Sequence, residues 1–312
     1  MKIASKKKRR VLLLGTALLV LIPLLYYGLG HIGIRPPGAR ADRRFAEEVN
    51  GQRCWDNTMD GRIPQTRAYD AMMQHMEGGE TRKLLLIGYD GTLASAAGRR
   101  AQEPGSAIGT LAAQGGLWLG QAGGAVPGEQ ATRTAPGWTS IFTGVWADRH
   151  GVYKNGDTLS PEARTILYQL SERGREVSFS FSWKPHLTDT YRDEAAEYPG
   201  VFQYRGNDAD TLKSMLGAID EGQDAVFGIF EYVDHAGHVT GYSADSPFYQ
   251  KALERAEAGA ARLIEAARAR ERQYGEDWLI IIATDHGGYG FDHFGPGLME
   301  STTFFAANQA IF

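Results

Sequence analysis

The sequence predicts an α/β protein with a three-layer α/β/α, doubly wound arrangement around a mostly parallel sheet. Short apolar runs of strand length alternate with longer segments of helical periodicity, which is the pattern of βαβ units. Parallel strands joined through helices form a sheet that is covered on both faces. With 312 residues and 43% hydrophobic content, the chain can bury a core of that size.

Residues 1–34 predict a basic cytoplasmic tail followed by a membrane anchor. The segment 11–34 contains no Asp, Glu, Lys or Arg and directly follows the cations at 6–10. About 20 apolar residues span a bilayer as a helix, and the cations favour the cytoplasmic side. A cleaved signal peptide or a buried core helix are the alternatives, but Tyr26 and Tyr27 stand where a cleavage site prefers small residues. We therefore expect an uncleaved anchor, with everything after Ile34 on the extracytoplasmic side, periplasmic or extracellular.

The charge balance and the cysteine count exclude several classes of protein. The total charge is −4, and the first 34 residues carry six cations and no acid, so the rest of the chain carries −10 (−4 minus 6). An acidic body of this kind predicts no nucleic-acid surface. The single cysteine, Cys54, excludes an intramolecular disulfide and a zinc site built from cysteines.

The elements after the anchor are expected in the following order. Residues 35–80 form a linker, in which Pro36 and Pro37 oppose helix, and a helical lead-in over 68–76. Residues 81–312 form the main α/β domain. Its expected strands are 83–91, 176–183, 224–234 and 278–287, and its expected helices are 161–174, 208–222 and 246–275. The Gly-rich stretch 109–130 is expected to be a flexible surface loop, because it lacks the Lys-Ser/Thr ending of a phosphate-binding P-loop.

Metal-binding side chains gather where these strands end. Asp90, Asp234 and Asp285 each follow an apolar run, and ligands of open α/β sheets bind beyond the carboxyl ends of strands. One such Asp would be an ordinary helix cap or turn residue; three of them beside histidines indicate a site. The histidines are His238, His286 and His293. Imidazole together with carboxylate suits zinc, and also manganese or iron. Six ligands favour two ions, and a single ion held by two histidines and one carboxylate is the alternative.

The segment 131–156 supplies a nucleophile. Thr134 precedes Ala-Pro and a helix-compatible run, so a turn that opens a helix would direct N–H groups and a positive dipole end towards an anion. A bound metal could ionise the hydroxyl. In isolation, Thr134 would be interpreted as a helix N-cap.

Taken together, four segments give the sequence a family resemblance. They are LLLIGYDG, TRTAPGWTSIFTGVWADRHGVYKNG, YVDHAGH and ATDHGGYGFDHFG, within residues 83–312. In their order and spacing they resemble the alkaline phosphatase superfamily, and most closely its nucleotide pyrophosphatase/phosphodiesterase branch. The resemblance implies an alkaline phosphatase-like fold, a bound pair of divalent ions with zinc as the expected metal, and a small phosphate ester as substrate.

The resemblance also implies roles for individual residues. Asp90, Asp285 and His286 would hold one zinc ion beside the Thr134 oxygen, which is the nucleophile. Asp234, His238 and His293 would hold the other zinc ion. Asn155 matches the asparagine of the family that donates a hydrogen bond to a phosphoryl oxygen.

Other residues in these segments have weaker interpretations. His150 and His235 are expected to be packed or solvent-facing, and not ligands. Arg133 could steer an anion towards Thr134 or point away from it. The group Trp183, Lys184 and His186 could wall a substrate pocket.

The expected activity is hydrolysis of a phosphoric ester, of the phosphodiesterase or nucleotide pyrophosphatase type, through a phosphothreonine. The alternatives are a membrane-anchored phosphoethanolamine-type transferase, a phosphomonoesterase or a non-catalytic binding module. A sulfatase is disfavoured because those enzymes draw a Cys or Ser nucleophile from a C/S-x-P-x-R motif. Two departures from the family are the sequence GTLAS after Asp90, where an arginine is common, and the early end at Phe312, which suggests a C-terminal truncation.

Overall fold

A computed structural model of the chain describes residues 61–124 and 130–312. The predicted basic tail, the anchor over 11–34, Cys54 and most of the linker lie outside the described residues. Within the described ranges, no helix combines the length and apolar character needed to cross a bilayer.

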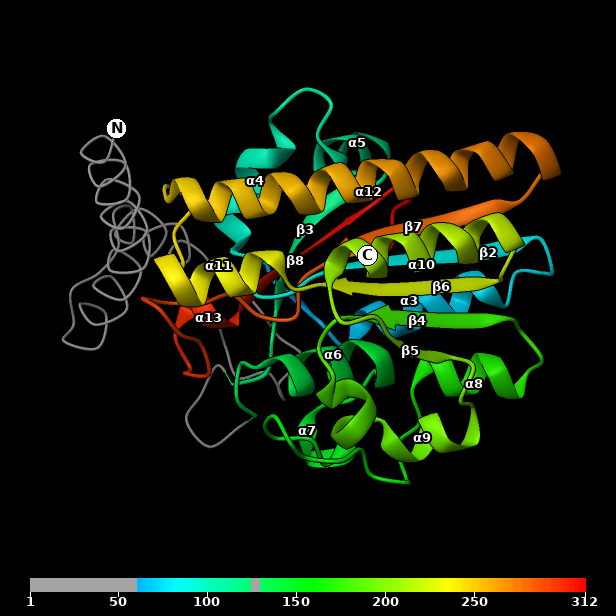
Figure 1. Cartoon of the computed structure of the whole chain (residues 1–312), viewed down its shortest axis with the longest axis horizontal. Coiled ribbons are helices and arrows are strands. Elements are labelled where there is room, and N and C mark those ends of the chain that lie inside the picture. Colours follow the sequence, from blue (N-terminus) through cyan, green and yellow to red (C-terminus); the bar gives the residue numbers. More distant parts are fainter. Residues whose placement is uncertain (1–60, 125–129) are drawn as a thin grey trace, which may run out of the picture.

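One sheet of eight strands forms the centre of the fold, in the order β1-β3-β8-β7-β2-β6-β4-β5. Only β8 runs antiparallel to its neighbours, β3 and β7, and the other pairings are parallel. The strand bounds are β1 Ile63–Pro64, β2 Arg82–Tyr89, β3 Gly116–Gln121, β4 Val177–Phe181, β5 Phe202–Tyr204, β6 Ala225–Phe230, β7 Asp277–Ala283 and β8 Thr302–Ala307. The predicted α/β fold with a mostly parallel sheet is therefore confirmed (Figure 1).

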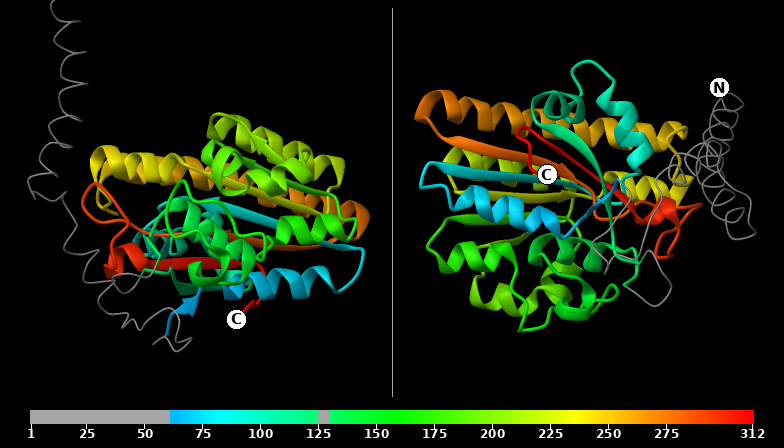
Figure 2. Two further views of the ribbon diagram at one scale, coloured as in Figure 1. Left: turned by 90° about the horizontal axis from the view of Figure 1, so that it is seen from below. Right: turned by 180° about the vertical axis from the view of Figure 1, so that it is seen from behind.

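Helices cover both faces of this sheet. One face carries α4 Ala94–Ala101, α5 Ala107–Gln114, α10 Asp208–Glu221 and α12 Pro247–Tyr274, and the other carries α3 Arg67–Met76, α6 Thr134–Thr143 and α8 Ile166–Glu172. Shorter helices are α7 Ala147–His150, α9 Arg192–Glu197, α11 Tyr232–Thr240, α13 Leu298–Ser301 and a π-helical turn, His186–Thr190. The views from below and from behind show α12 running along one side of the sheet (Figure 2).

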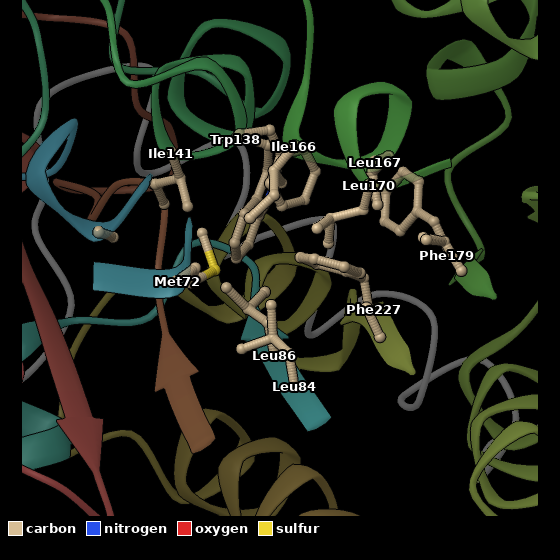
Figure 3. Close-up of a cluster of buried hydrophobic side chains, with 14 of the residues drawn as sticks. Met72, Leu84, Leu86, Trp138, Ile141, Ile166, Leu167, Leu170, Phe179 and Phe227 are labelled. Carbon is tan, nitrogen blue, oxygen red and sulfur yellow. The ribbon is translucent and has the colours of Figure 1, made fainter. Parts of the chain in front are cut away.

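Two hydrophobic cores follow from the alternation of side chains along the buried strands. In β2, Leu85 and Ile87 pack against the α12 side, whereas Leu84 and Leu86 pack against the α6 side. Figure 3 shows the second core, in which Trp138 of α6 lies close to side chains of α3 and β2. This packing fixes the first turn of α6 against the sheet.

Local signals explain where the long helices begin and end. The Ser246 side chain accepts a hydrogen bond from the Tyr249 N–H ahead of Pro247, and Gly275 ends α12 in the left-handed conformation. The Asn207 side chain caps α10 in the same way. Helix α8 begins at Ile166, later than the sequence predicts, because the Thr165 side chain caps it there.

Two sequence predictions about elements are wrong. The stretch 109–130 is not a surface loop, since it contains the end of α5 and strand β3; residues 125–129 lie outside the description. Strand β3 forms because Leu117 packs into one core and Trp118 into the other, while the strand pairs with β8. The expected strand 224–234 ends at Phe230, and Asp234 lies in the first turn of α11. The Asp208 carboxylate accepts the Tyr232 N–H (2.8 Å) where this helix begins.

Candidate metal centre

The order of strands brings distant residues to one edge of the sheet. Strands β7, β2 and β6 are neighbours, with β2 in the middle. Asp90 follows β2, Asp285 and His286 follow β7, and α11 with Asp234 follows β6. The six predicted ligands therefore meet at the carboxyl ends of the three central strands, although they span about two hundred positions of the sequence.

The first group consists of Asp90, Asp285 and His286, all fully buried. The His286 Nε2 atom lies 3.5 Å from Asp90 Oδ1 and 3.3 Å from Asp285 Oδ2. None of these three atoms has a hydrogen-bond partner among the described residues. The other ring nitrogen, Nδ1, faces the Gly287 carbonyl at 2.7 Å, so it carries the proton and leaves Nε2 with a lone pair. Three acceptors that converge in a buried place are suited to holding a cation.

The second group consists of Asp234, His238 and His293. The two imidazoles approach each other, with 3.2 Å between their Nε2 atoms. Each Nε2 atom also lies near the Asp234 carboxylate, at 3.3 Å for His238 and 3.6 Å for His293. Both Nδ1 atoms face backbone carbonyls, those of Phe291 (3.0 Å) and Thr132 (2.8 Å). In the neutral form of each ring with the proton on Nδ1, both Nε2 lone pairs point into the space beside Asp234.

The spacing of the donors fits zinc. Zn–N and Zn–O bonds of about 2.0–2.2 Å in a tetrahedral site put neighbouring donors about 3.3–3.6 Å apart. The distances in both groups, 3.2–3.6 Å, match that separation. The ligand atoms of Asp90, Asp285 and His286 lie within 4.8 Å of one another, and so do those of Asp234, His286 and His293. The donor set therefore fits two adjacent ions.

Burial and charge crowding shift the pKa values in this cluster. Burial, and then the nearby carboxylates, raise the pKa of Asp90 and of Asp285 well above the usual range. Burial and the His293 imidazole lower the pKa of His286. Burial acts to lower the pKa of His238, but the Asp234 carboxylate outweighs it and raises that pKa to about 9. Burial acts to raise the pKa of Asp234, yet the His238 hydrogen bond and the imidazoles leave it lowered.

Neighbouring side chains hold the carboxylates in place. The Trp138 Nε1–H donates to Asp90 Oδ2 (2.9 Å), and the Tyr242 hydroxyl donates to Asp234 Oδ1. Gly91 has φ +59°, and a Cβ at this position would collide with the Asp234 carboxylate. Metal-ligating carboxylates characteristically have hydrogen-bonded supports of this kind.

Thr134 and Asn155 lie together at the start of α6, whose first turn packs against the first group. Helix α6 begins at Thr134, which is 4% exposed. The N-cap residue of this helix is therefore Arg133 and not Thr134. The first turn of α6 packs against Asp285, because a Cβ on Gly137 would come within 2.8 Å of the Asp285 backbone oxygen. The Asn155 Oδ1 atom accepts the Ala135 N–H at 2.9 Å. The Asn155 amide thus stands at the helix N-terminus, one residue from the Thr134 hydroxyl.

Glu231 belongs to this cluster and was not predicted. It is 3% exposed, its Oε1 atom has no hydrogen-bond partner in the described part of the chain, and its ligand atom groups with those of Asp90 and Asp234 within 4.8 Å. Burial, and then the Asp90 charge, raise the pKa of Glu231 well above its usual range. The sequence signal was its position directly after strand β6, where Asp90 stands after β2.

The residues with weaker interpretations lie outside the two groups. His150 is buried, accepting the Val152 N–H at Nδ1 and contacting the Ser140 hydroxyl, and His235 is exposed. The idea that His186 walls a substrate pocket is wrong, because it is fully buried among aromatic rings. Trp183 packs edge-on against it, with ring centroids 4.9 Å apart.

Fold and site together define a mostly parallel α/β protein with a candidate two-ion centre at the carboxyl edge of its sheet. The family model of type I phosphodiesterase / nucleotide pyrophosphatase matches residues 162–293. That finding confirms the resemblance to the nucleotide pyrophosphatase/phosphodiesterase branch of the alkaline phosphatase superfamily. The matched segment contains Asp234, His238, Asp285, His286 and His293. No curated protein sequence matches the chain.

Solved structures show likeness in fold. A 2-O GAG sulfatase, BT1596, has a TM-score of 0.55 at 13% identity, over 74% of this chain and 64% of its own. Murine ectonucleotide pyrophosphatase/phosphodiesterase 5 has a TM-score of 0.48 at 19% identity and is matched over 66% of this chain. The chain spans 57% of the length of that murine protein. A protein of the alkaline phosphatase superfamily from Vibrio parahaemolyticus has a TM-score of 0.48 at 13% identity, over 83% of this chain and 70% of its own.

Proposed function

We propose that the chain is a phosphoric ester hydrolase of the phosphodiesterase or nucleotide pyrophosphatase type, acting through a phosphothreonine at Thr134. The observation that carries this proposal is the convergence of six imidazole and carboxylate ligands, five of them buried, at the place where the N-terminal turn of α6 with Thr134 packs. The match of the phosphodiesterase family model to residues 162–293 supports the same reaction class.

The ligands are assigned to two divalent ions, with zinc as the expected metal. Asp90, Asp285 and His286 would hold one ion, and Asp234, His238 and His293 would hold the other. When bound, such ions supply Lewis acidity that favours an ionised hydroxyl and offsets negative charge on phosphate oxygens. The buried ligand atoms of the first group, which have no hydrogen-bond partner in the part of the chain that the structure describes, are suited to this task.

The proposed reaction proceeds in two displacements at phosphorus. The Thr134 oxygen forms a bond to phosphorus while the bond to the ester oxygen breaks, and the departing alcohol takes a proton. The Asn155 amide, held by the Ala135 N–H, donates to a phosphoryl oxygen. Water then cleaves the phosphothreonine and restores the hydroxyl of Thr134. Two inversions give net retention at phosphorus.

The proposed location is extracytoplasmic, with the domain tethered by an uncleaved anchor at residues 11–34. The charge-free apolar run behind five cations supports this proposal. Fusing a reporter that is active only outside the cytoplasm to Phe312 tests it. Reporter activity that persists when the chain starts at residue 35 would contradict the anchor.

The function is tested with the purified full-length chain. We expect zinc in a ratio of about two per chain by elemental analysis and turnover of a bis-aryl phosphate. Thr134→Ala should abolish turnover while the zinc content is retained in large part. Thr143→Ala is the matched control, because its hydroxyl lies in the same helix and, among the described residues, bonds only to backbone atoms of Thr139 and Val145.

Two further measurements separate this function from its rivals. Acid quenching of the reaction should trap one phosphoryl group on the peptide that contains Thr134, as detected by mass spectrometry. Faster turnover of an aryl sulfate than of any aryl phosphate would reject the phosphoric ester, and full activity of Thr134→Ala would reject the nucleophile. Bound zinc without turnover of any ester would favour a binding module.

A further inference from the structure

Exposed apolar side chains gather at the edge of the sheet that carries the candidate ligands. Six large hydrophobic side chains are exposed in the described part of the chain. One of them, Tyr274, ends α12 at the amino edge of the sheet, shortly before β7 begins. The other five lie at the carboxyl edge: Tyr153, Tyr204, Val239, Phe248 and Phe294. Single exposed apolar residues are common on soluble proteins, so the informative observation is that five of them share one edge.

Four of these side chains border the two ligand groups, and we call them the apolar rim: Tyr153, Phe294, Val239 and Phe248, which are 44–68% exposed. The first two are tied to the segment that leads into α6. The Tyr153 carbonyl accepts the Ala131 N–H at 2.9 Å, and the Thr132 hydroxyl accepts the Phe294 N–H at 3.0 Å. Phe294 directly follows the candidate ligand His293.

The other half of the apolar rim lies on α11 and α12. Val239 follows the candidate ligand His238 in α11. The hydroxyls of Thr240 and Ser246 are 3.3 Å apart, which joins the end of α11 to the start of α12, where Phe248 stands. Figure 1 shows α11 and the start of α12 at the same end of the sheet, with the end of α12 at the opposite side. The second ligand group, with His238 from α11, therefore joins the two halves of the rim.

The described chain enters the domain at this same edge. Strand β1 pairs with Gly120 and Gln121, the last residues of β3. Strand β3 runs in the direction of β2, because β3 and β7 are both antiparallel to β8 and β7 is parallel to β2. The sequence places 26 residues between Ile34, where the apolar run ends, and Gly61, the first described residue. An anchor at 11–34 would thus hold the domain by the edge that carries the apolar rim.

Two cations accompany the apolar rim. The guanidinium of Arg133 lies over the Phe294 ring, with 4.4 Å between Cζ and the ring centroid. Lys154 directly follows Tyr153 and is exposed. Aromatic rings beside Lys and Arg are typical of surfaces that lie in the interfacial layer of a membrane, where the rings contact acyl chains and the cations contact lipid phosphates.

We propose that the carboxyl edge of the sheet docks on the surface of a lipid bilayer through the apolar rim, so that the candidate metal centre lies next to the membrane. A few apolar side chains bind a bilayer only weakly by themselves. A tether that enters at the same edge keeps the rim at a high local concentration near the lipid, so weak contacts suffice. The inference goes beyond the proposed function, because it does not require that the site cleaves an ester.

The test measures how close each edge lies to lipid in the full-length chain. The chain is reconstituted into vesicles of phosphatidylcholine and phosphatidylglycerol, after Cys54→Ser has removed the native thiol. A fluorophore is attached through Val239→Cys, and in a second sample through Tyr274→Cys, which is the matched control. Tyr274 is also exposed and lies about 40 Å from Phe248 along α12. Lipids that carry a nitroxide near the glycerol should quench the fluorophore at position 239 and leave the one at position 274 unquenched.

A second pair of variants tests whether the apolar rim causes the docking. With the fluorophore at position 239, Phe248→Ser should lower the ratio of docked to undocked domain about tenfold, because one large apolar contact with lipid is lost. Tyr274→Ser, on the opposite edge, should leave this ratio unchanged. Urea unfolding of each labelled variant verifies that the fold is retained.

Several results would overturn the inference. These are equal quenching at both positions, no quenching at position 239, or an unchanged ratio in Phe248→Ser. A fluorophore at position 239 that is shielded from aqueous iodide but not quenched by the lipids would mean that another part of the chain or a second copy covers the rim, which also contradicts docking. Flotation of the vesicles reports on the anchor separately, and turnover of a bis-aryl phosphate reports on the hydrolase, so failure of either is distinguishable from failure of docking.

Discussion

Removing one hydroxyl should weaken one of the two proposed ions selectively. The Tyr242 hydroxyl donates to Asp234 Oδ1, and both residues are buried, at 0% and 6% exposure. A hydrogen bond to a charged acceptor contributes about 1.5–3 kcal/mol. At about 1.4 kcal/mol per factor of ten, Tyr242→Phe should lower the affinity of the ion held by Asp234, His238 and His293 by about tenfold to a hundredfold.

A second tyrosine provides the matched control. The Tyr89 hydroxyl donates to Glu257 Oε1 at 3.0 Å, and both side chains are buried. Glu257 also accepts the Ala107 N–H and does not belong to the candidate metal groups of the described chain. Tyr89→Phe therefore removes the same kind of bond from a carboxylate that holds no ion. Both variants should lose a similar free energy of unfolding, about 1.5–3 kcal/mol.

The assay is a competition titration of metal-free protein with zinc against a chromophoric chelator, which resolves the two binding steps. Urea unfolding of the same metal-free samples measures the loss of stability. Only Tyr242→Phe should weaken a binding step, and only one of the two. An equal loss of zinc affinity in both variants, or unchanged binding in Tyr242→Phe, would refute the assignment of Asp234 as a ligand.

Three more outcomes follow from particular contacts. Gly91→Ala should destabilise the protein and lower its zinc content, because Cβ meets the Asp234 carboxylate; Gly105→Ala, at φ +78° with open space around it, should keep its zinc. Burial lowers the pKa of His186 to about 3 from about 6.5, so its contribution to stability is complete above pH 6.5 and is lost as the pH falls. By urea unfolding, His186→Phe should therefore gain about 3 kcal/mol relative to wild type between pH 7.5 and 4.5, and parallel pH profiles would contradict this. Chelation of the metal should lower the thermal midpoint of the wild type by several degrees, and restored zinc should return it.

The long, periodic elements were predictable from the sequence, and the unusual ones were not. Strands β2, β6 and β7 contain runs of apolar residues, which is how buried parallel strands appear, and β4 alternates Val and Phe with serines. Strand β3 is rich in glycine, and its apolar residues number only three, so local composition indicated a loop. Its strand conformation depends on pairing with β8, nearly two hundred residues later. Tertiary pairing of that kind leaves no signal in a single sequence.

The residues of the candidate site also fall into those that the sequence indicated and those that only the structure shows. The candidate ligands were predicted because Asp90, Asp234 and Asp285 follow apolar runs and histidines stand near two of them, and Thr134 was predicted because it precedes Ala-Pro and a helix-compatible run. Glu231 also stands directly after an apolar strand, but it was not predicted. Asp234, three residues later, was chosen as the ligand after that strand because His238 lies near it in the sequence. The supports from Trp138 and Tyr242 were unpredictable, since they reach the carboxylates across the fold from α6 and from the loop before α12. Only the three-dimensional packing shows which aromatic residue carries a polar contact.

The buried acids connect folding with the proposed chemistry. Asp90, Glu231, Asp234 and Asp285 lie within the same edge of the sheet, and each is at most 6% exposed. Burying one unpaired charge costs several kcal/mol, whereas the whole stability of a domain is about 5–15 kcal/mol. The imidazoles offset only part of this charge, because burial lowers the pKa values of His286 and His293 and so disfavours the charged form of those rings. A divalent cation between the carboxylates would supply the missing charge, so the ions proposed for catalysis should also stabilise the carboxyl edge of the sheet.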